Sequence, residues 1–142
     1  GVKPFLVASS IQAVMAQRLI RVLCPKCKEP DPTPDPKYLR LVDISAEDLA
    51  SHTLMKGVGC DNCAGTGYRG RKAIFEMMTM NQEIRSLAFE RASVSDLRRA
   101  ALANGMRSLL YDGKLKVLKG ITTAGEIARM AQVEGAQGVE QK

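Results

Sequence analysis

Four cysteines in this sequence are paired in a pattern that is typical of metal binding or redox chemistry. Cys24 and Cys27 form one C-x-x-C pair, and Cys60 and Cys63 form a second. This spacing lets both sulfurs of a tight turn point the same way, and two such turns facing each other supply the tetrahedron of thiolates that structural zinc requires. Because protein fills all four coordination positions, none is left for water or substrate. We therefore predict a structural zinc site rather than a catalytic one.

Three other uses of these thiols stay open at this point. Disulfides are uncommon outside oxidising compartments, and nothing in the sequence indicates secretion. A redox-active C-x-x-C needs only one pair beside a βαβ pattern, whereas an iron–sulfur cluster takes four thiolates as zinc does. His52 is the only histidine, and because four cysteines already complete a tetrahedron, we expect it at a surface or at a helix end.

The glycines after the second pair do not form a phosphate loop. A Walker A loop reads G-x-x-x-x-G-K-[S/T], but in "GTGYRGRK" the last glycine is followed by arginine, lysine and then alanine. Glycine is favoured where the backbone turns sharply. We therefore interpret these glycines as part of the turn around the cysteines.

Length, composition and charge set further bounds. The 142 residues are 45% apolar, which suits one ordinary domain or two small ones with a core. We interpret the net charge of +6 as a solvated basic surface; because the basic residues are scattered, nucleic acid is not an expected direct ligand. No apolar run approaches the ~20 residues that span a bilayer, so no transmembrane segment is expected. The chain begins with Gly1, and its first methionine is Met15, so we expect a piece of a longer protein.

The elements that must position the cysteines follow from local signals. A serine pair can cap a helix over about 10–22 that leads into the first pair. The stretch "KEPDPTPDP" has proline at every second position over 30–36, which predicts an extended linker. Ser45 with Asp48 resembles a capping box, which predicts a short helix before the second pair.

The second half of the chain is predicted to be mostly helical. A short apolar run at 73–78 has strand character. The tail from residue 133 lacks periodicity and is predicted to be disordered. The expected fold class is therefore α+β, mostly α. Helices are predicted after Asn81, after Ser93 or Ser95, over 106–119, and over 124–132, where Thr123 and Glu126 form a capping box.

Three phrases of the sequence together resemble a known family. They are "AQRLIRVLCPKCK", "GCDNCAGTGYRGRKAIFE" and "GMRSLLYDGKLKVLKGITTAGEIARM". They are similar to the C-terminal region of the secretion-type assembly ATPases, which form the GspE/PulE/PilB family of type II secretion and type IV pilus assembly. The resemblance covers nearly the whole chain, from about Phe5 to Met130.

The resemblance implies that the complete protein is a cytoplasmic homohexameric motor with a RecA-like core. Such a motor hydrolyses ATP with Mg²⁺, drives pilin or pseudopilin assembly, and docks on an inner-membrane platform protein. The four cysteines match the family's tetracysteine zinc site. Walker A and Walker B are absent from this sequence, so the fragment has no phosphate cradle and no Mg²⁺ carboxylates. We expect the parent to be an ATPase and the fragment itself to be no enzyme.

On this resemblance the chain divides into four parts. Residues 1–23 resemble the tail of the RecA-like core, and 24–72 form the zinc module with its proline-rich linker. Residues 73–132 form a small C-terminal helical subdomain, and 133–142 are a disordered tail. Pilus assembly, protein secretion and DNA uptake all fit the resemblance.

Two arginines are expected to serve the intact motor. Arg18 and Arg71 are the preferred contacts to nucleotide or to a neighbouring subunit, because arginine suits bidentate contacts to phosphate or carboxylate. The simpler interpretation of both is a surface or intramolecular salt bridge.

Two other function classes stay open beside the motor. "CDNCAGTG" fits the C-x-x-C-x-G-x-G repeat of the DnaJ-type zinc domain, although only one such repeat occurs. A nucleic-acid-binding zinc ribbon is the second alternative, and it calls for exposed aromatic residues or a basic stripe near the cysteines.

Overall fold

The computed structural model describes residues 1–137 and has an α+β fold with seven α-helices and two small sheets. Two compact units can be separated in it: residues 1–17 with 75–109, and residues 18–74 with 110–137. Each unit thus joins segments that are distant in the sequence. The long strands β1 (Ala13–Leu23) and β4 (Tyr68–Thr79) pair with each other, and each strand has one end in each unit.

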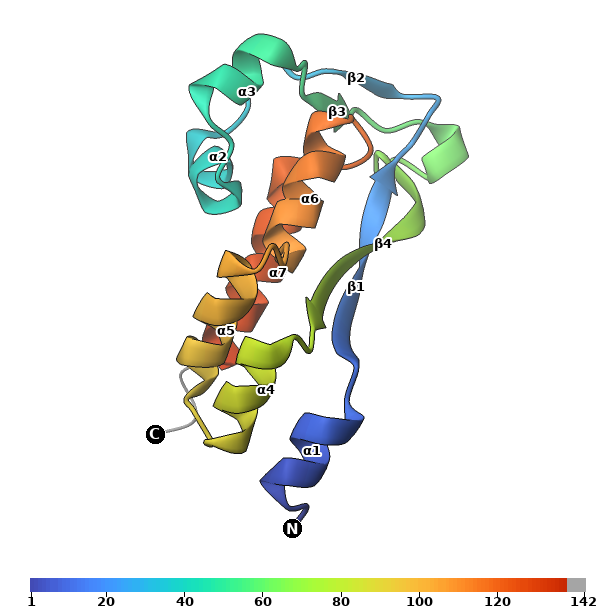
Figure 1. Cartoon of the computed structure of the whole chain (residues 1–142). Coiled ribbons are helices and arrows are strands. Elements are labelled where there is room, and N and C mark those ends of the chain that lie inside the picture. The colour runs from blue at the N-terminus through green and yellow to red at the C-terminus, as the bar shows by residue number, and fades with distance from the viewer. Residues whose placement is uncertain (138–142) are drawn as a thin grey trace. The chain divides into compact units, whose positions relative to one another are not determined.

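The first unit consists of three helices and one end of the β1–β4 sheet. α1 (Pro4–Ser10) packs against α4 (Gln82–Phe89), which packs against α5 (Val94–Ala103) (Figure 1). The predicted starts of the last two helices are confirmed: the side chains of Asn81 and Ser93 accept hydrogen bonds from backbone N–H groups in the first turn. The unit has its own apolar core, formed by Met80, Ile84, Ala100 and Ala101.

The second unit contains the cysteines. β2 (Lys28–Pro30) and β3 (Met55–Gly57) form an antiparallel ribbon in which Lys28 lies opposite Gly57. Between these strands the chain forms α2 (Pro36–Val42) and α3 (Ala46–Ser51), and α2 packs against α7 (Ala124–Gln137) (Figure 1). Most of α6 (Leu109–Leu118) also belongs to this unit. The capping box of Ser45 and Asp48 is present at α3, as predicted.

The helix predicted over about 10–22 is wrong, because this segment is the strand β1. Alanine, leucine, methionine, glutamine and arginine favour helix, and they dominate the segment. Pairing with β4 makes the segment a strand instead. At the two ends of the pair, the N–H of Met80 donates to the carbonyl of Gln12 at 2.9 Å, and the N–H of Cys24 donates to the carbonyl of Gly67 at 2.9 Å. The strand predicted at 73–78 is confirmed and is the second half of β4. Tertiary pairing has overridden a weak local preference.

The stretch 28–36 between the cysteine pairs is extended as predicted, except for its last residue. It ends where Asp35 caps α2 with its side chain and Pro36 occupies the first helical position, a combination that suits a helix start. At the other end of the chain, α7 continues through Gln137, whereas disorder was predicted from residue 133. Alanine, glutamine and glutamate favour helix even without an apolar stripe. The rest of the predicted tail, 138–142, lies outside the described residues.

The helices that follow β4 belong to different units. α4 and α5 lie in the first unit, whereas α7 and most of α6 lie in the second. The proposed domain boundaries at 23, 72 and 132 stay a prediction.

Candidate metal centre

The four cysteine sulfurs come together in the second unit, all within 4.8 Å of one another. The Sγ atoms of Cys24 and Cys60 are 3.9 Å apart, and that of Cys63 lies 3.8 Å from those of both Cys27 and Cys60. Tetrahedral zinc with bonds of about 2.3 Å places its sulfurs about 3.8 Å apart, whereas a disulfide needs about 2.05 Å. The sulfurs are therefore spaced for a metal ion and not for disulfides.

Two similar turns, here called the first knuckle (24–28) and the second knuckle (60–65), aim the sulfurs inward. In the first, the carbonyl of Cys24 accepts from the N–H groups of Cys27 at 3.3 Å and Lys28 at 3.0 Å. In the second, the carbonyl of Cys60 accepts from Cys63 at 3.1 Å and Gly65 at 3.0 Å. The repeated pattern explains why the two C-x-x-C pairs present their thiols in the same way.

Glycine is required at positions 57 and 67, where the end of β3 lies against the residue that precedes β4. A Cβ on Gly57 would overlap the backbone of Gly67, and a Cβ on Gly67 would lie 2.6 Å from the carbonyl oxygen of Gly57. Gly67 also has φ of +76°, a conformation that other residues adopt only at a cost. This close approach lets the carbonyl of Gly67 accept from Cys24 while its N–H faces the sulfur of Cys63.

Hydrogen bonds favour the ionised form of two of the thiols. Burial opposes ionisation of Cys63, but the N–H groups of Cys60 at 3.3 Å and Gly67 at 3.2 Å outweigh it and lower the pKa of Cys63 to about 6. The side-chain amide of Asn62 donates to the sulfur of Cys24 at 3.2 Å and is the main reason that its pKa is lowered. Thiolates are the form that binds metal.

The Cys27 thiol, unlike those of Cys24 and Cys63, has a raised pKa. Burial raises the pKa of the Cys27 thiol, so the protein's own groups favour its protonated form. A bound divalent cation reverses this preference, because it is the largest local charge and deprotonates the thiols that coordinate it. The donor set of four largely buried sulfurs fits zinc in a closed, structural site. His52 lies at the end of α3, where its Nδ1 is 3.2 Å from the carbonyl of Asp48.

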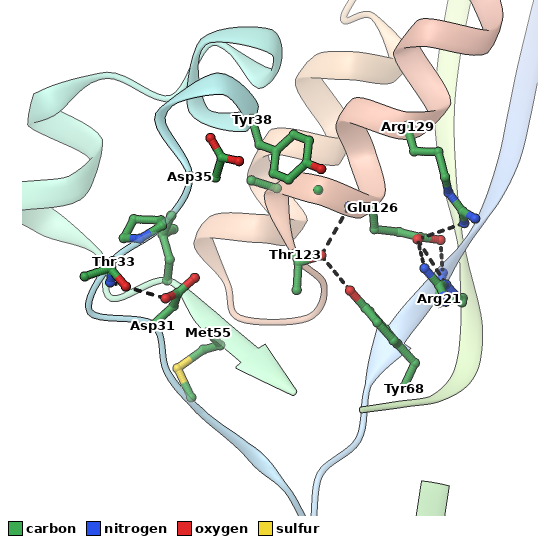
Figure 2. A pocket seen from close by; sticks show the side chains of 14 residues that line it. Arg21, Asp31, Thr33, Asp35, Tyr38, Met55, Tyr68, Thr123, Glu126 and Arg129 are labelled. Carbon is green, nitrogen blue, oxygen red and sulfur yellow. Dashed lines mark hydrogen bonds and ion pairs between the residues drawn. The ribbon is translucent and has the colours of Figure 1, made fainter. Parts of the chain in front are cut away.

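A second feature of this unit is a pocket of about 390 Å³ beside the start of α7, shown in Figure 2. Glu126 lies in its wall with only 4% of its side chain exposed. Its carboxylate accepts from Arg21 three times, from the backbone N–H at 3.1 Å, from Nε at 3.0 Å and from Nη2 at 2.7 Å, and from Arg129 at 2.9 Å. Both guanidinium nitrogens of Arg21 donate to Oε2 and its backbone N–H donates to Oε1, so the pair joins β1 to α7.

An aromatic ring and a hydroxyl complete this contact. The guanidinium of Arg21 lies 4.2 Å from the ring centroid of Tyr68, and the Tyr68 hydroxyl hydrogen-bonds Thr123 at 2.7 Å (Figure 2). Burial opposes ionisation of Glu126, but the hydrogen bonds from Arg21 outweigh it and lower the pKa of Glu126. The carboxylate is thus charged and paired, which is the condition for burying it without a large penalty.

Comparison with known proteins shows which family this chain belongs to. The family model described as "Type II/IV secretion system protein" matches residues 1–129. The chain belongs to this family. A "Type IV pilus assembly ATPase PilB" of Thermus thermophilus is 39% identical to this chain; the match covers 89% of this chain and 14% of the relative. A "Type II secretion system protein E" of Pseudomonas aeruginosa is 40% identical; the match covers 94% of this chain and 26% of the relative.

The chain spans only a small part of its curated relatives. A "Type IV pilus assembly ATPase PilB" of Myxococcus xanthus is 38% identical over 89% of this chain, which is 22% of that relative. No helix within residues 1–137 is both long and apolar enough to cross a membrane.

In this Type II/IV secretion family chain, the structure gathers the four predicted cysteines but not the two predicted arginines. Arg18 and Arg71 are exposed on β1 and β4, and their contacts to nucleotide or a neighbouring subunit stay a prediction. The arginine that lines the pocket from β1 is Arg21, which is paired with Glu126.

Sequence reasoning found Glu126 only as half of a capping box. The N–H of Glu126 does donate to Thr123 Oγ1 at 3.2 Å, but its carboxylate binds Arg21 and Arg129. Nothing in the local pattern names a partner that lies 105 positions away. The role of Asn62 was also missed, because neither spacing nor composition distinguishes it from other residues between paired cysteines.

Proposed function

We propose that the chain is the zinc-stabilised C-terminal module of a hexameric ATPase motor that powers pilin or pseudopilin assembly in type IV pilus biogenesis or type II secretion. The observation that carries the proposal is the set of four sulfurs within 4.8 Å of one another in a chain of the Type II/IV secretion family. The names of its relatives, pilus assembly ATPases and type II secretion proteins, support the kind of motor.

Within this motor the module is structural and not catalytic. ATP and Mg²⁺ are bound by other parts of the complete protein, and residues 1–23 are the tail of its RecA-like core. The metal, when bound, supplies four bonds that tie the two knuckles together. Cys24, Cys27, Cys60 and Cys63 hold it, while N–H groups of Cys60 and Gly67 stabilise the charge of Cys63 and the amide of Asn62 that of Cys24.

The proposed partners are the rest of the ATPase and the neighbouring subunits of a homohexamer. Arg18 and Arg71 contact one of these or the nucleotide. The assembled motor lies in the cytoplasm against an inner-membrane platform protein. The family match over 1–129 supports this assignment over a DnaJ-type or nucleic-acid-binding zinc module, because the match includes the helices beyond the cysteines.

ATP turnover tests the division of labour. We expect the 142-residue chain to show no turnover above its Cys60→Ser variant, and the complete protein to hydrolyse ATP. In cells carrying the complete protein, Cys60→Ser abolishes pilus assembly or secretion, whereas the control His52→Ala leaves it intact. Turnover by the chain alone, or full function with Cys60→Ser, contradicts the proposal.

A further inference from the structure

Asn62, between the two cysteines of the second knuckle, connects a sulfur of the first knuckle to an arginine on β4. Its side-chain Nδ2 donates to the Sγ of Cys24 at 3.2 Å. Its Oδ1 accepts from Nη1 of Arg69 at 2.8 Å, and the same Nη1 also donates to the backbone carbonyl of Asn62. A continuous line of hydrogen bonds therefore runs from Arg69 through Asn62 to Cys24.

Arg69 determines which end of the Asn62 amide faces the sulfur. A guanidinium donates hydrogen bonds and accepts none, so it must face the amide oxygen. The amide nitrogen is then left to face Cys24, where it can donate. Without Arg69 the amide could rotate and turn its oxygen toward a thiolate, which would repel it.

The hydrogen bonds from Arg69 through Asn62 to Cys24 offset negative charge at the metal centre. Four thiolates around one divalent cation carry an excess of two negative charges, and hydrogen bonds to the sulfurs are the means by which a protein offsets such charge. Cys63 receives backbone N–H groups from Cys60 and Gly67, and these donors do not belong to a side chain. Cys24 receives a backbone hydrogen bond from Lys26 and, in addition, the side-chain N–H of Asn62, which depends on the identity of that residue.

We propose that Asn62 is a positioning residue of the metal centre, holding the Cys24 thiolate in its metal-binding orientation, and that Arg69 orients Asn62. This inference rests on the proposed zinc site. It adds that Asn62 and Arg69 control how tightly the metal is retained, through the single ligand Cys24. Residues that hydrogen-bond to metal ligands typically change metal affinity about 10–100-fold when they are replaced.

Zinc transfer from the loaded 142-residue chain to a chromophoric chelator tests the proposal, with the freed thiols trapped by an alkylating agent and mapped by peptide mass spectrometry. We expect Asn62→Ala to release zinc about tenfold faster. Asn62→Asp has the same shape but no donor, so it should release zinc faster still. Arg69→Gln should fall between wild type and Asn62→Ala. The control is Asp61→Ala at the exposed neighbouring position, which should match wild type.

The alkylation map separates positioning from general loosening of the fold. Positioning predicts that Cys24 is alkylated first in the Asn62 variants, ahead of the other three cysteines. Equal alkylation of all four, or release at the wild-type rate from both Asn62 variants, overturns the role of Asn62. If wild type carries no zinc, the proposed function's metal site and this inference fall together; if wild type carries zinc and the variants do not differ, only the inference falls.

Discussion

The Glu126 carboxylate joins two parts of the second unit that are far apart in the sequence. One buried carboxylate receives hydrogen bonds from the backbone and side chain of Arg21 and from Arg129. The pair bridges β1 and α7, the first and last described elements of that unit. Such a group stabilises the fold only while its main partner, here Arg21, is present, because a buried charge that loses its partner is costly.

We therefore expect Glu126→Ala to lower the free energy of unfolding by about 2 kcal/mol. The loss is smaller than for a fully buried pair, because 46% of the Arg21 side chain is exposed and water can solvate it. The matched control is Arg129→Ala, which removes an outer partner with 64% of its side chain exposed and should change stability by less than about 0.5 kcal/mol. Urea unfolding followed by circular dichroism measures both; equal losses in the two variants would contradict this assignment.

At the scale of elements, the helices α3 and α6 are joined by a second ion pair. Lys114 of α6 donates to the Asp48 carboxylate at 2.7 Å and to the carbonyl of Asp43 at 2.6 Å. Asp48 also completes the capping box of α3, accepting from the N–H of Ser45 at 2.8 Å. One carboxylate thus serves both the start of a short helix and its attachment to a longer one.

This arrangement predicts a pH dependence. The hydrogen bond from Lys114, aided by that from Ser45, lowers the pKa of Asp48 to about 2. A carboxyl whose pKa is lowered on folding stabilises the fold fully above its unfolded pKa of about 3.9, and the contribution is lost as pH falls toward the folded pKa. The difference in unfolding free energy between wild type and Asp48→Asn should be constant above about pH 5 and shrink between about pH 4 and 2. A difference that persists unchanged to pH 2 would refute the pairing.

Elements also differ in how far the sequence could predict them. The caps at Ser45, Asn81 and Ser93 are local, since each depends on residues a few positions apart, and these predictions are confirmed. The structure also gathers the four cysteines, while their binding of a metal stays a prediction. β1 is a strand only because β4 pairs with it. The links from Arg21 to Glu126 and from Asn62 to Cys24 depend on side chains brought together by the fold. No spacing rule encodes such contacts.

At the scale of the whole molecule, the cysteine centre belongs to only one of the two units. The second unit contains the knuckles, α2, α3, α7 and most of α6, whereas α4 and α5 pack around their own core in the first. Structural zinc contributes on the order of 10 kcal/mol or more to small sites of this kind. Removal of the metal should therefore act on one unit far more than on the other.

Hydrogen exchange read by mass spectrometry tests this division. After chelation, or in Cys60→Ser, we expect faster exchange in 24–67 and in α7, with α4 and α5 retaining the protection of the metal-loaded chain. His52→Ala serves as the control and should exchange as wild type does. Equal acceleration in both units would show that the metal supports the chain as a single cooperative body.

Metal content shows whether the four cysteines hold one structural zinc ion. Elemental mass spectrometry of the purified chain should find one zinc per chain, and a thiol count should find four cysteines that become reactive only after chelation. A chain that carries no zinc and presents four freely reactive thiols before chelation would contradict the account.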